Sequence, residues 1–83
     1  MVVRKGQLTP AQIDREWPHQ VEIAVPPLGL GSRLNELHVA AAEVDAGYRT
    51  RSRTEGADHF IRFCFRTPGT AKAFRDSCGG DLV

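Results

Sequence analysis

The sequence predicts a single α+β domain in which a short N-terminal helix is followed by a strand, a helix, two strands and a helix. Three features indicate this order: stretches with apolar residues at every second position, stretches with apolar residues at helical spacing, and Gly- or Pro-rich breaks between them. We expect a ferredoxin-like arrangement without a clear fourth strand, because only residues 81–83 follow the last helix. The helices are expected on one face of the sheet, which leaves the other face open.

Length and composition limit what the chain can be. Its 83 residues are expected to form one small domain, 1–83, with residues 1–7 as a flexible tail. Hydrophobic residues make up 41% of the sequence and the net charge is +1, which excludes a disordered chain and a strong overall field for a polyanion. The charged start of the sequence lacks the apolar stretch of a signal peptide, so we expect none, and no apolar run approaches the roughly 20 residues of a membrane span. We therefore expect a soluble cytoplasmic protein with two free cysteines and no membrane partner.

The first half of the chain is predicted to contain two helices and a strand. Thr9 and Pro10 are typical of the start of a short helix, which a downstream proline ends. Residues 19–25 alternate between apolar and polar side chains, which predicts a half-buried strand. The second helix is predicted to run from an N-cap at Ser32 to a left-handed Gly47. Its apolar stripe is Leu30, Leu34, Leu37, Ala41 and Val44.

The second half is predicted to be a β-hairpin followed by a helix. Residues 48–54 and 59–66 alternate around a turn at residues 55–58. The first of these runs is also compatible with an irregular basic loop, because every second residue is an arginine. The last helix is expected from residue 68 to the glycine pair at 79–80, with an apolar stripe of Ala71, Phe74 and Cys78.

Arginine side chains are expected to gather on one face of this hairpin. Arg49, Arg51 and Arg53 occupy every second position, so a strand directs them to one side. The turn places this side next to Phe60 and Arg62 of the following strand. Guanidinium groups beside an exposed ring suit the phosphates and bases of single-stranded nucleic acid. The predicted anion-binding or partner-binding residues are Arg49, Arg51, Arg53, Phe60, Arg62 and Arg66.

Two simpler interpretations stay open for these features. The arginines also suit a charged edge strand that prevents sheets from aggregating, with Glu22 paired to Arg62. The loop at residues 27–33 has two glycines before a helix, which suits binding of a phosphate or carboxylate but also suits an ordinary helix start.

The remaining chemically versatile residues do not form a recognisable catalytic or metal site. Trp17 suits either an anchor that holds the N-terminal helix on the sheet or, together with His19, an interface with a partner. Cys64 shares the side of the arginines and is a candidate reactive thiol, whereas burial would make it inert. The spacing of the histidines and cysteines is not that of a metal site. We expect no enzyme activity, no metal and no cofactor.

Residues 13–21 read Ile-Asp-Arg-Glu-Trp-Pro-His-Gln-Val. Together with residues 63–65 and the segments 73–76 and 79–80, they resemble a group of small uncharacterised bacterial proteins. The resemblance covers both ends of the domain, and the arginine-rich middle matches less clearly. It implies a bacterial cytosolic domain. It assigns no activity, so no residue takes a role from it.

Two functions from different classes are consistent with these observations. The first is a non-enzymatic interaction module whose open sheet face contacts an unknown protein partner or another copy of the chain in a homo-oligomer. The second is binding of single-stranded nucleic acid or another polyanion through the arginine-rich face.

Overall fold

The computed structural model describes residues 9–83. In this part of the chain the elements are α1 (Pro10–Glu16), β1 (His19–Val25), α2 (Ser32–Val44), β2 (Arg49–Glu55), β3 (Asp58–Phe65), α3 (Pro68–Cys78) and β4 (Asp81–Leu82). The fold is therefore α+β, as the sequence predicts. The tail expected at residues 1–7 lies outside the described residues. None of the described helices is long and apolar enough to cross a bilayer.

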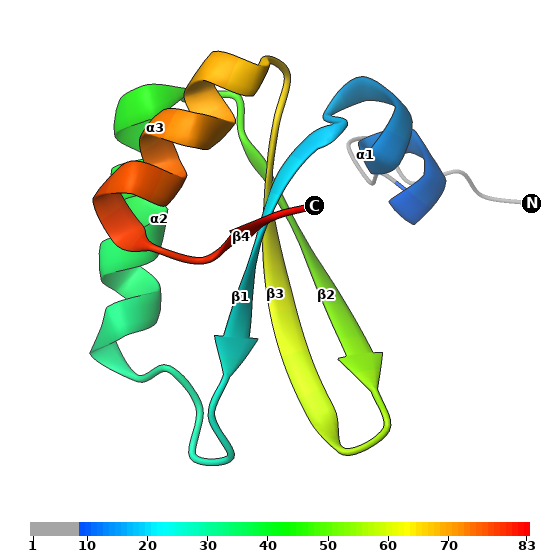
Figure 1. The fold of residues 1–83 in the computed structure, drawn as a ribbon, viewed down its shortest axis with the longest axis vertical. Helices are drawn as coiled ribbons and strands as arrows, with labels where there is room; N and C mark the ends of the chain where they lie inside the picture. Colours follow the sequence, from blue (N-terminus) through cyan, green and yellow to red (C-terminus); the bar gives the residue numbers. More distant parts are fainter. Residues whose placement is uncertain (1–8) are drawn as a thin grey trace, which may run out of the picture.

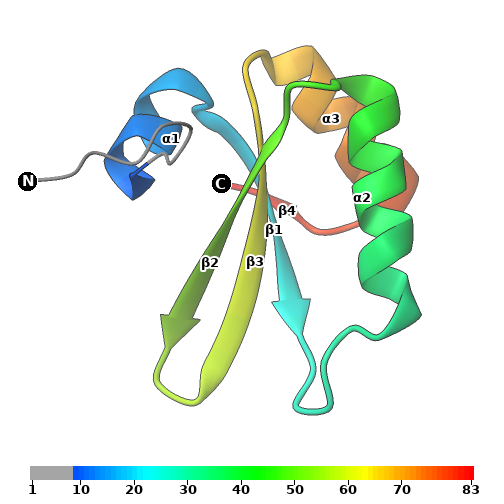
Figure 2. The same ribbon diagram turned by 180° about the vertical axis from the view of Figure 1, so that it is seen from behind.

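The four strands form one antiparallel sheet in the order β2-β3-β1-β4. β3 lies between β2 and β1, so the hairpin of β2 and β3 is joined to the rest of the sheet through β1. The helices α2 and α3 pack on one side of this sheet and α1 lies on its other side (Figures 1 and 2). The molecule is thus a sheet with a full helical layer on one face and a single short helix on the other.

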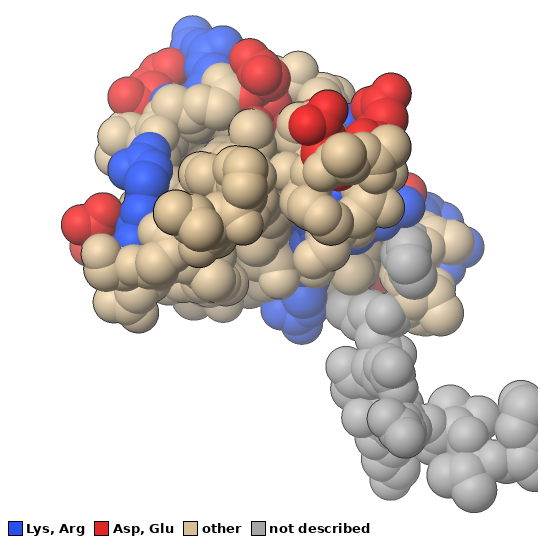
Figure 3. Space-filling model, turned by 90° about the horizontal axis from the view of Figure 1, so that it is seen from below, with Lys and Arg blue, Asp and Glu red and all other residues tan. Residues whose placement is uncertain are grey.

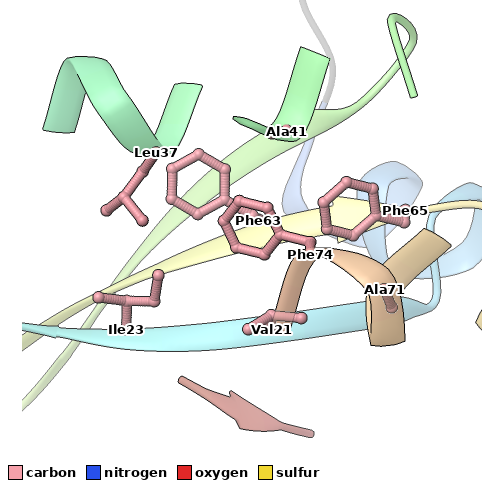
Figure 4. Close-up of a cluster of buried hydrophobic side chains, with 8 residues drawn as sticks. All are labelled: Val21, Ile23, Leu37, Ala41, Phe63, Phe65, Ala71 and Phe74. Carbon is pink, nitrogen blue, oxygen red and sulfur yellow. The ribbon is translucent and has the colours of Figure 1, made fainter. Parts of the chain in front are cut away.

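The main core lies between the sheet and the helices α2 and α3 (Figure 4). Side chains alternate along a strand, so every second residue of β1 and β3 points into this core. Phe63 and Phe74 are fully buried, and their ring centroids are 4.9 Å apart. The buried residues of this cluster are Val21, Ile23, Leu37, Ala41, Phe63, Phe65, Ala71 and Phe74.

A second, smaller buried cluster lies on the opposite face of the sheet. α1 starts with a capping box, in which the Thr9 hydroxyl accepts a hydrogen bond from the backbone N–H of Gln12 and the Gln12 side chain accepts one from the backbone N–H of Thr9. The helix delivers Ile13 and Trp17 onto Cys64 of β3. The expectation that the helices share one face of the sheet is therefore wrong for α1, which covers one end of the face expected to be open.

The expectation of a sheet without a fourth strand is also wrong. Leu82 of β4 pairs with Val21 of β1, and the backbone N–H of Val83 donates to the carbonyl oxygen of Gln20 at 3.0 Å. A strand of two residues is too short to produce an alternating pattern in the sequence. It forms because the glycines at positions 79 and 80 take positive φ angles and turn the chain back along β1.

The ends of α2 differ from the predicted caps. Gly31, with φ of 57°, is the N-cap in place of Ser32, and no side chain caps this end. Asp45 is the C-cap, and its carboxylate accepts a hydrogen bond from the backbone N–H of Gly47 at 2.9 Å. Gly47 is therefore held in a turn stabilised by a side chain and does not take the left-handed conformation.

We predict that Gly80→Ala destabilises the protein more than Gly79→Ala. The φ angles of both glycines are positive, +99° and +82°, so alanine at either position is strained, at a cost of about 1–3 kcal/mol. Only at Gly80 does an added Cβ meet the main chain, 2.9 Å from the carbonyl oxygen of Glu22, whereas nothing lies within 4 Å at Gly79. Urea unfolding measures the two losses. Equal losses would contradict the close approach of β4 to β1.

Candidate functional site

The hairpin of β2 and β3 places the predicted arginines on the sheet face opposite the main core. Its register pairs Arg51 with Arg62 and Arg53 with Phe60, as the sequence predicts. The turn therefore consists of two residues, because Glu55 pairs with Asp58. β1 and α1 bring carboxylates to the same face, and these determine what the arginines contact.

Glu22 of β1 lies between two of the predicted arginines. Its Oε2 accepts a hydrogen bond from Nε of Arg53 at 2.9 Å and from Nε of Arg62 at 2.8 Å, and its Oε1 accepts from Nη2 of Arg53 at 3.0 Å. The Glu22 side chain is only 13% exposed. The hydrogen bond from Arg53, with that from Arg62, lowers the pKa of the Glu22 carboxyl to about 2, against the opposing effect of burial.

A second ion pair joins β2 to α1. Nη1 of Arg51 donates to both carboxylate oxygens of Asp14 at 2.9 Å. Together with the two arginines on Glu22, three of the predicted arginines contact carboxylates of the same face. A polyanion that binds them must compete with these internal partners, which are held in place by the fold.

Arg49 and Arg66 are in a different situation. Their guanidinium carbons lie 4.8 and 4.9 Å from the centroid of the Trp17 ring. Nη1 of Arg49 also donates to the carbonyl oxygens of Gly47 and Tyr48, at 3.2 and 3.0 Å. Within residues 9–83, neither of these arginines forms an ion pair with a carboxylate. The structure thus divides the predicted set into three paired arginines and two unpaired ones.

Trp17 is an anchor. It is 3% exposed, and its Nε1–H donates to the carbonyl oxygen of Gly47 at 2.9 Å. This contact ties α1 to the segment between α2 and β2. The alternative interpretation, an exposed tryptophan at an interface, does not fit, because the ring is buried against Cys64 and in contact with the side chains of Arg49 and Arg66.

His19 and Phe60, the other two residues predicted to take part in binding, are both half-buried. His19 is half-buried at the start of β1, opposite Phe65 in the strand register. Phe60 is half-buried, and the guanidinium carbon of Arg53 lies 4.6 Å from its ring centroid. An arginine of the protein itself therefore already stacks on the ring that was expected to stack on a base.

Cys64 does not have the surroundings of a nucleophile. It is fully buried, and burial, together with the charge of Asp14, raises the pKa of its thiol to about 11. Very little thiolate forms at neutral pH under these conditions. Within the described part of the chain, His, Cys, Asp and Glu side chains do not come together in a group of three that could hold a metal ion.

An apolar hollow lies at the end of the fold where β1 leads into α2 and β2 turns into β3. Its volume is about 370 Å³. It forms because the inner face of the sheet and the apolar stripe of α2 extend beyond the last buried layer of the main core. The apolar residues that line it are Val25, Leu30, Leu34, Phe60 and Ile61. Gly29 and the polar or charged hairpin residues Ser52, Arg53, Thr54 and His59 complete the lining.

A fully exposed leucine lies beside this hollow. Leu28 is 100% exposed, in a turn closed by a hydrogen bond from the backbone N–H of Gly29 to the carbonyl oxygen of Pro26 at 2.8 Å. Viewed from this end, a broad part of the surface carries no charged side chain, although Lys and Arg atoms appear beside it as well as toward the margins (Figure 3). The sequence pattern of this loop indicated either an anion site or an ordinary helix start, and not an apolar contact. The missed signal is a leucine enclosed by Pro-Pro and Gly, which a turn exposes.

Comparison with known proteins adds no assignment. No family model matches this chain, and neither a curated protein nor a solved structure matches it. The arguments about function therefore depend on the geometry of the chain itself.

We predict that Glu22→Gln destabilises the protein at neutral pH by about 1–3 kcal/mol, because it leaves two guanidinium groups without their carboxylate. A lowered pKa in the folded state means that the Glu22 carboxylate stabilises the fold fully above pH 4.5, its ordinary pKa, and that this contribution is lost as the pH falls toward 2. Urea unfolding should therefore show the wild-type and variant stabilities converging over this pH range.

The matched control for this experiment is Glu36→Gln, since Glu36 is an exposed residue of α2. The control should follow the wild type at every pH. A constant difference between the wild type and Glu22→Gln down to pH 2 would contradict the ion-pair assignment.

Proposed function

We propose that this protein is a small non-enzymatic interaction module that associates with a second copy of itself through the end of the fold that carries Leu28 and the hollow. The observation that carries the proposal is the pairing, at one end of the molecule, of a fully exposed leucine with an apolar hollow of about 370 Å³. This moves the expected interface from the open sheet face to the end of the sheet.

The arrangement proposed for the module is the ferredoxin-like βαββαβ fold, preceded by α1. The element order from β1 to β4 and the sheet order β2-β3-β1-β4 support this assignment. In this arrangement the loop from β1 to α2 and the turn from β2 to β3 lie at the same end of the sheet, which is why Leu28 and the hollow are neighbours.

Self-association is supported because one chain carries both complementary features. A two-fold axis at this end would place Leu28 of each copy into the hollow of the other, which is the closed, self-complementary contact typical of homodimers. The turn at Pro26–Gly29 holds the leucine in position before contact, so little conformational freedom is lost on association. The hollow also falls within the size range of about 300–1,000 Å³ typical of ligand-binding pockets.

The expected association is weak. Burial of a leucine side chain contributes about 1.5–3 kcal/mol. Two such burials compete with the loss of translational and rotational freedom, which costs several kcal/mol. The dimer is therefore expected to form in a concentration-dependent manner, and the monomer to be a stable folded species.

Binding of a polyanion along the hairpin receives less support. Arg51, Arg53 and Arg62 already contact carboxylates of the same face. Trp17 is buried and Phe60 is partly covered by Arg53, so an exposed aromatic platform for bases is lacking among these residues. The burial of Cys64 likewise gives no support to an enzyme that uses it as a nucleophile.

A cytoplasmic location is part of the proposal. It is supported by the two cysteines, which are both free thiols. Unpaired thiols are typical of a reducing compartment.

We predict that wild-type protein dimerises as its concentration rises from about 10 µM to about 1 mM, and that Leu28→Ser weakens this dimer about tenfold or more because it removes the inserted side chain. Sedimentation velocity measures both. Val39→Ser is the matched control, since Val39 is an exposed apolar residue of α2 that does not line the hollow. Ser52→Phe, which adds a ring beside the hollow, should weaken the dimer as Leu28→Ser does.

Two results would contradict the proposal. One is a wild-type protein that stays monomeric over the whole concentration range. The other is a dimer that Leu28→Ser and Val39→Ser weaken equally. Circular dichroism and urea unfolding of each variant separate a loss of association from a loss of folding.

A further inference from the structure

The two unpaired arginines lie at the opposite end of β2 from the hollow. Arg49 is the first residue of β2, and Arg66 directly follows β3. Both guanidinium groups contact the ring of Trp17, so their central carbons are at most about 10 Å apart, which is about one Debye length at 0.1 M salt. Both side chains are exposed. Two exposed cations thus contact the same buried ring.

Within residues 9–83, no carboxylate lies within ion-pair distance of Arg49 or Arg66. Asp45 lies in the same corner, but its Oδ1 accepts the hydrogen bond from the backbone N–H of Gly47 and is not within ion-pair distance of Arg66. The segment before α1, residues 1–8, contains no Asp or Glu and contributes Arg4 and Lys5 to the sequence. The guanidinium group of Arg49 instead donates hydrogen bonds to two backbone carbonyl oxygens, which are uncharged acceptors.

We infer that Arg49 and Arg66, held by Trp17, form a binding site for a single phosphate monoester. Guanidinium groups donate paired, charge-assisted hydrogen bonds to phosphate oxygens, and a dianion between two of them relieves their mutual repulsion. The arrangement favours one phosphate over a nucleic-acid strand for two reasons. The next arginine along β2, Arg51, is occupied by Asp14, and the ring of Trp17 is too buried to stack on a base.

This site is independent of the proposed dimer, because the residues involved lie at different ends of the sheet. A phosphate monoester can come from a phosphorylated side chain of another protein or from a small molecule such as a nucleoside monophosphate. Both present the same dianion to the arginines, and the experiment distinguishes them.

The protein contains its own reporter for this test, because Trp17 is its single tryptophan and contacts both guanidinium groups. Inorganic phosphate should produce a saturable change in tryptophan fluorescence at constant ionic strength, and sodium chloride should not. The double variant Arg49→Gln/Arg66→Gln should bind phosphate about tenfold more weakly or worse, since it loses the charged donors. Isothermal titration calorimetry provides a readout that does not depend on the ring.

Two further variants sharpen the assignment. Asp45→Asn keeps an oxygen for the backbone N–H of Gly47 and removes a nearby negative charge, so it should bind phosphate more tightly than the wild type. Arg75→Gln removes an arginine of α3 that is paired with Asp76 and should leave binding unchanged. Circular dichroism shows whether each variant is folded.

A phosphoserine peptide and a nucleoside monophosphate are then titrated in parallel, and the one that saturates at the lower concentration identifies the source of the phosphate. The inference is overturned by a phosphate response equal to that of sodium chloride, or by equal binding to the wild type and the double variant. Binding of a short thymidine oligonucleotide that tightens with its length would also overturn it, in favour of a strand-binding surface.

Discussion

The carboxylate of Glu22 lies in the middle of the second face of the sheet, between the guanidinium groups of Arg53 and Arg62. These contacts join all three long strands, because Arg53 belongs to β2, Arg62 to β3 and Glu22 to β1. Burial alone would favour the protonated form of the Glu22 carboxyl. The hydrogen bonds from Arg53 and Arg62 outweigh this effect and keep the carboxyl ionised. The contact therefore fixes how the hairpin lies against β1, and it offsets part of the positive charge that a polyanion would otherwise use.

The remaining surface features follow from this arrangement. Trp17 and α1 cover the end of the same face near Cys64, so this end of the face is not open. Two features remain exposed: an apolar hollow beside Leu28 at one end of the sheet and, in contact with Trp17 at the other end, two arginines that form no ion pair within residues 9–83. The two proposals assign an apolar contact to the first and an anion to the second, in keeping with the chemistry that each end presents.

The elements with local signals were predictable from the sequence. Proline and capping residues mark the starts of α1 and α3, and alternation marks β1 and β3. A turn of either two or four residues at 55–58 gives the same strand pairing, so the register of the arginines was predicted correctly although the turn length was not. Contacts without a local signal were not predictable. The partner of Arg51 is 37 residues away, in α1, and depends on which face this helix covers. The two residues of β4 carry no pattern, and the hollow depends on how far α2 extends beyond the buried layer of the core.

Amide chemical shifts recorded by NMR during dilution test most directly whether the end of the fold, and not the ion-paired face, is the contact surface. On this account, shifts that depend on protein concentration are confined to the turn at residues 26–31 and the facing hairpin residues 52–61, while Gln20 and Glu22 of β1 do not change. Shifts centred on Gln20, Glu22 and Arg62, with the Leu28 turn unchanged, would contradict it.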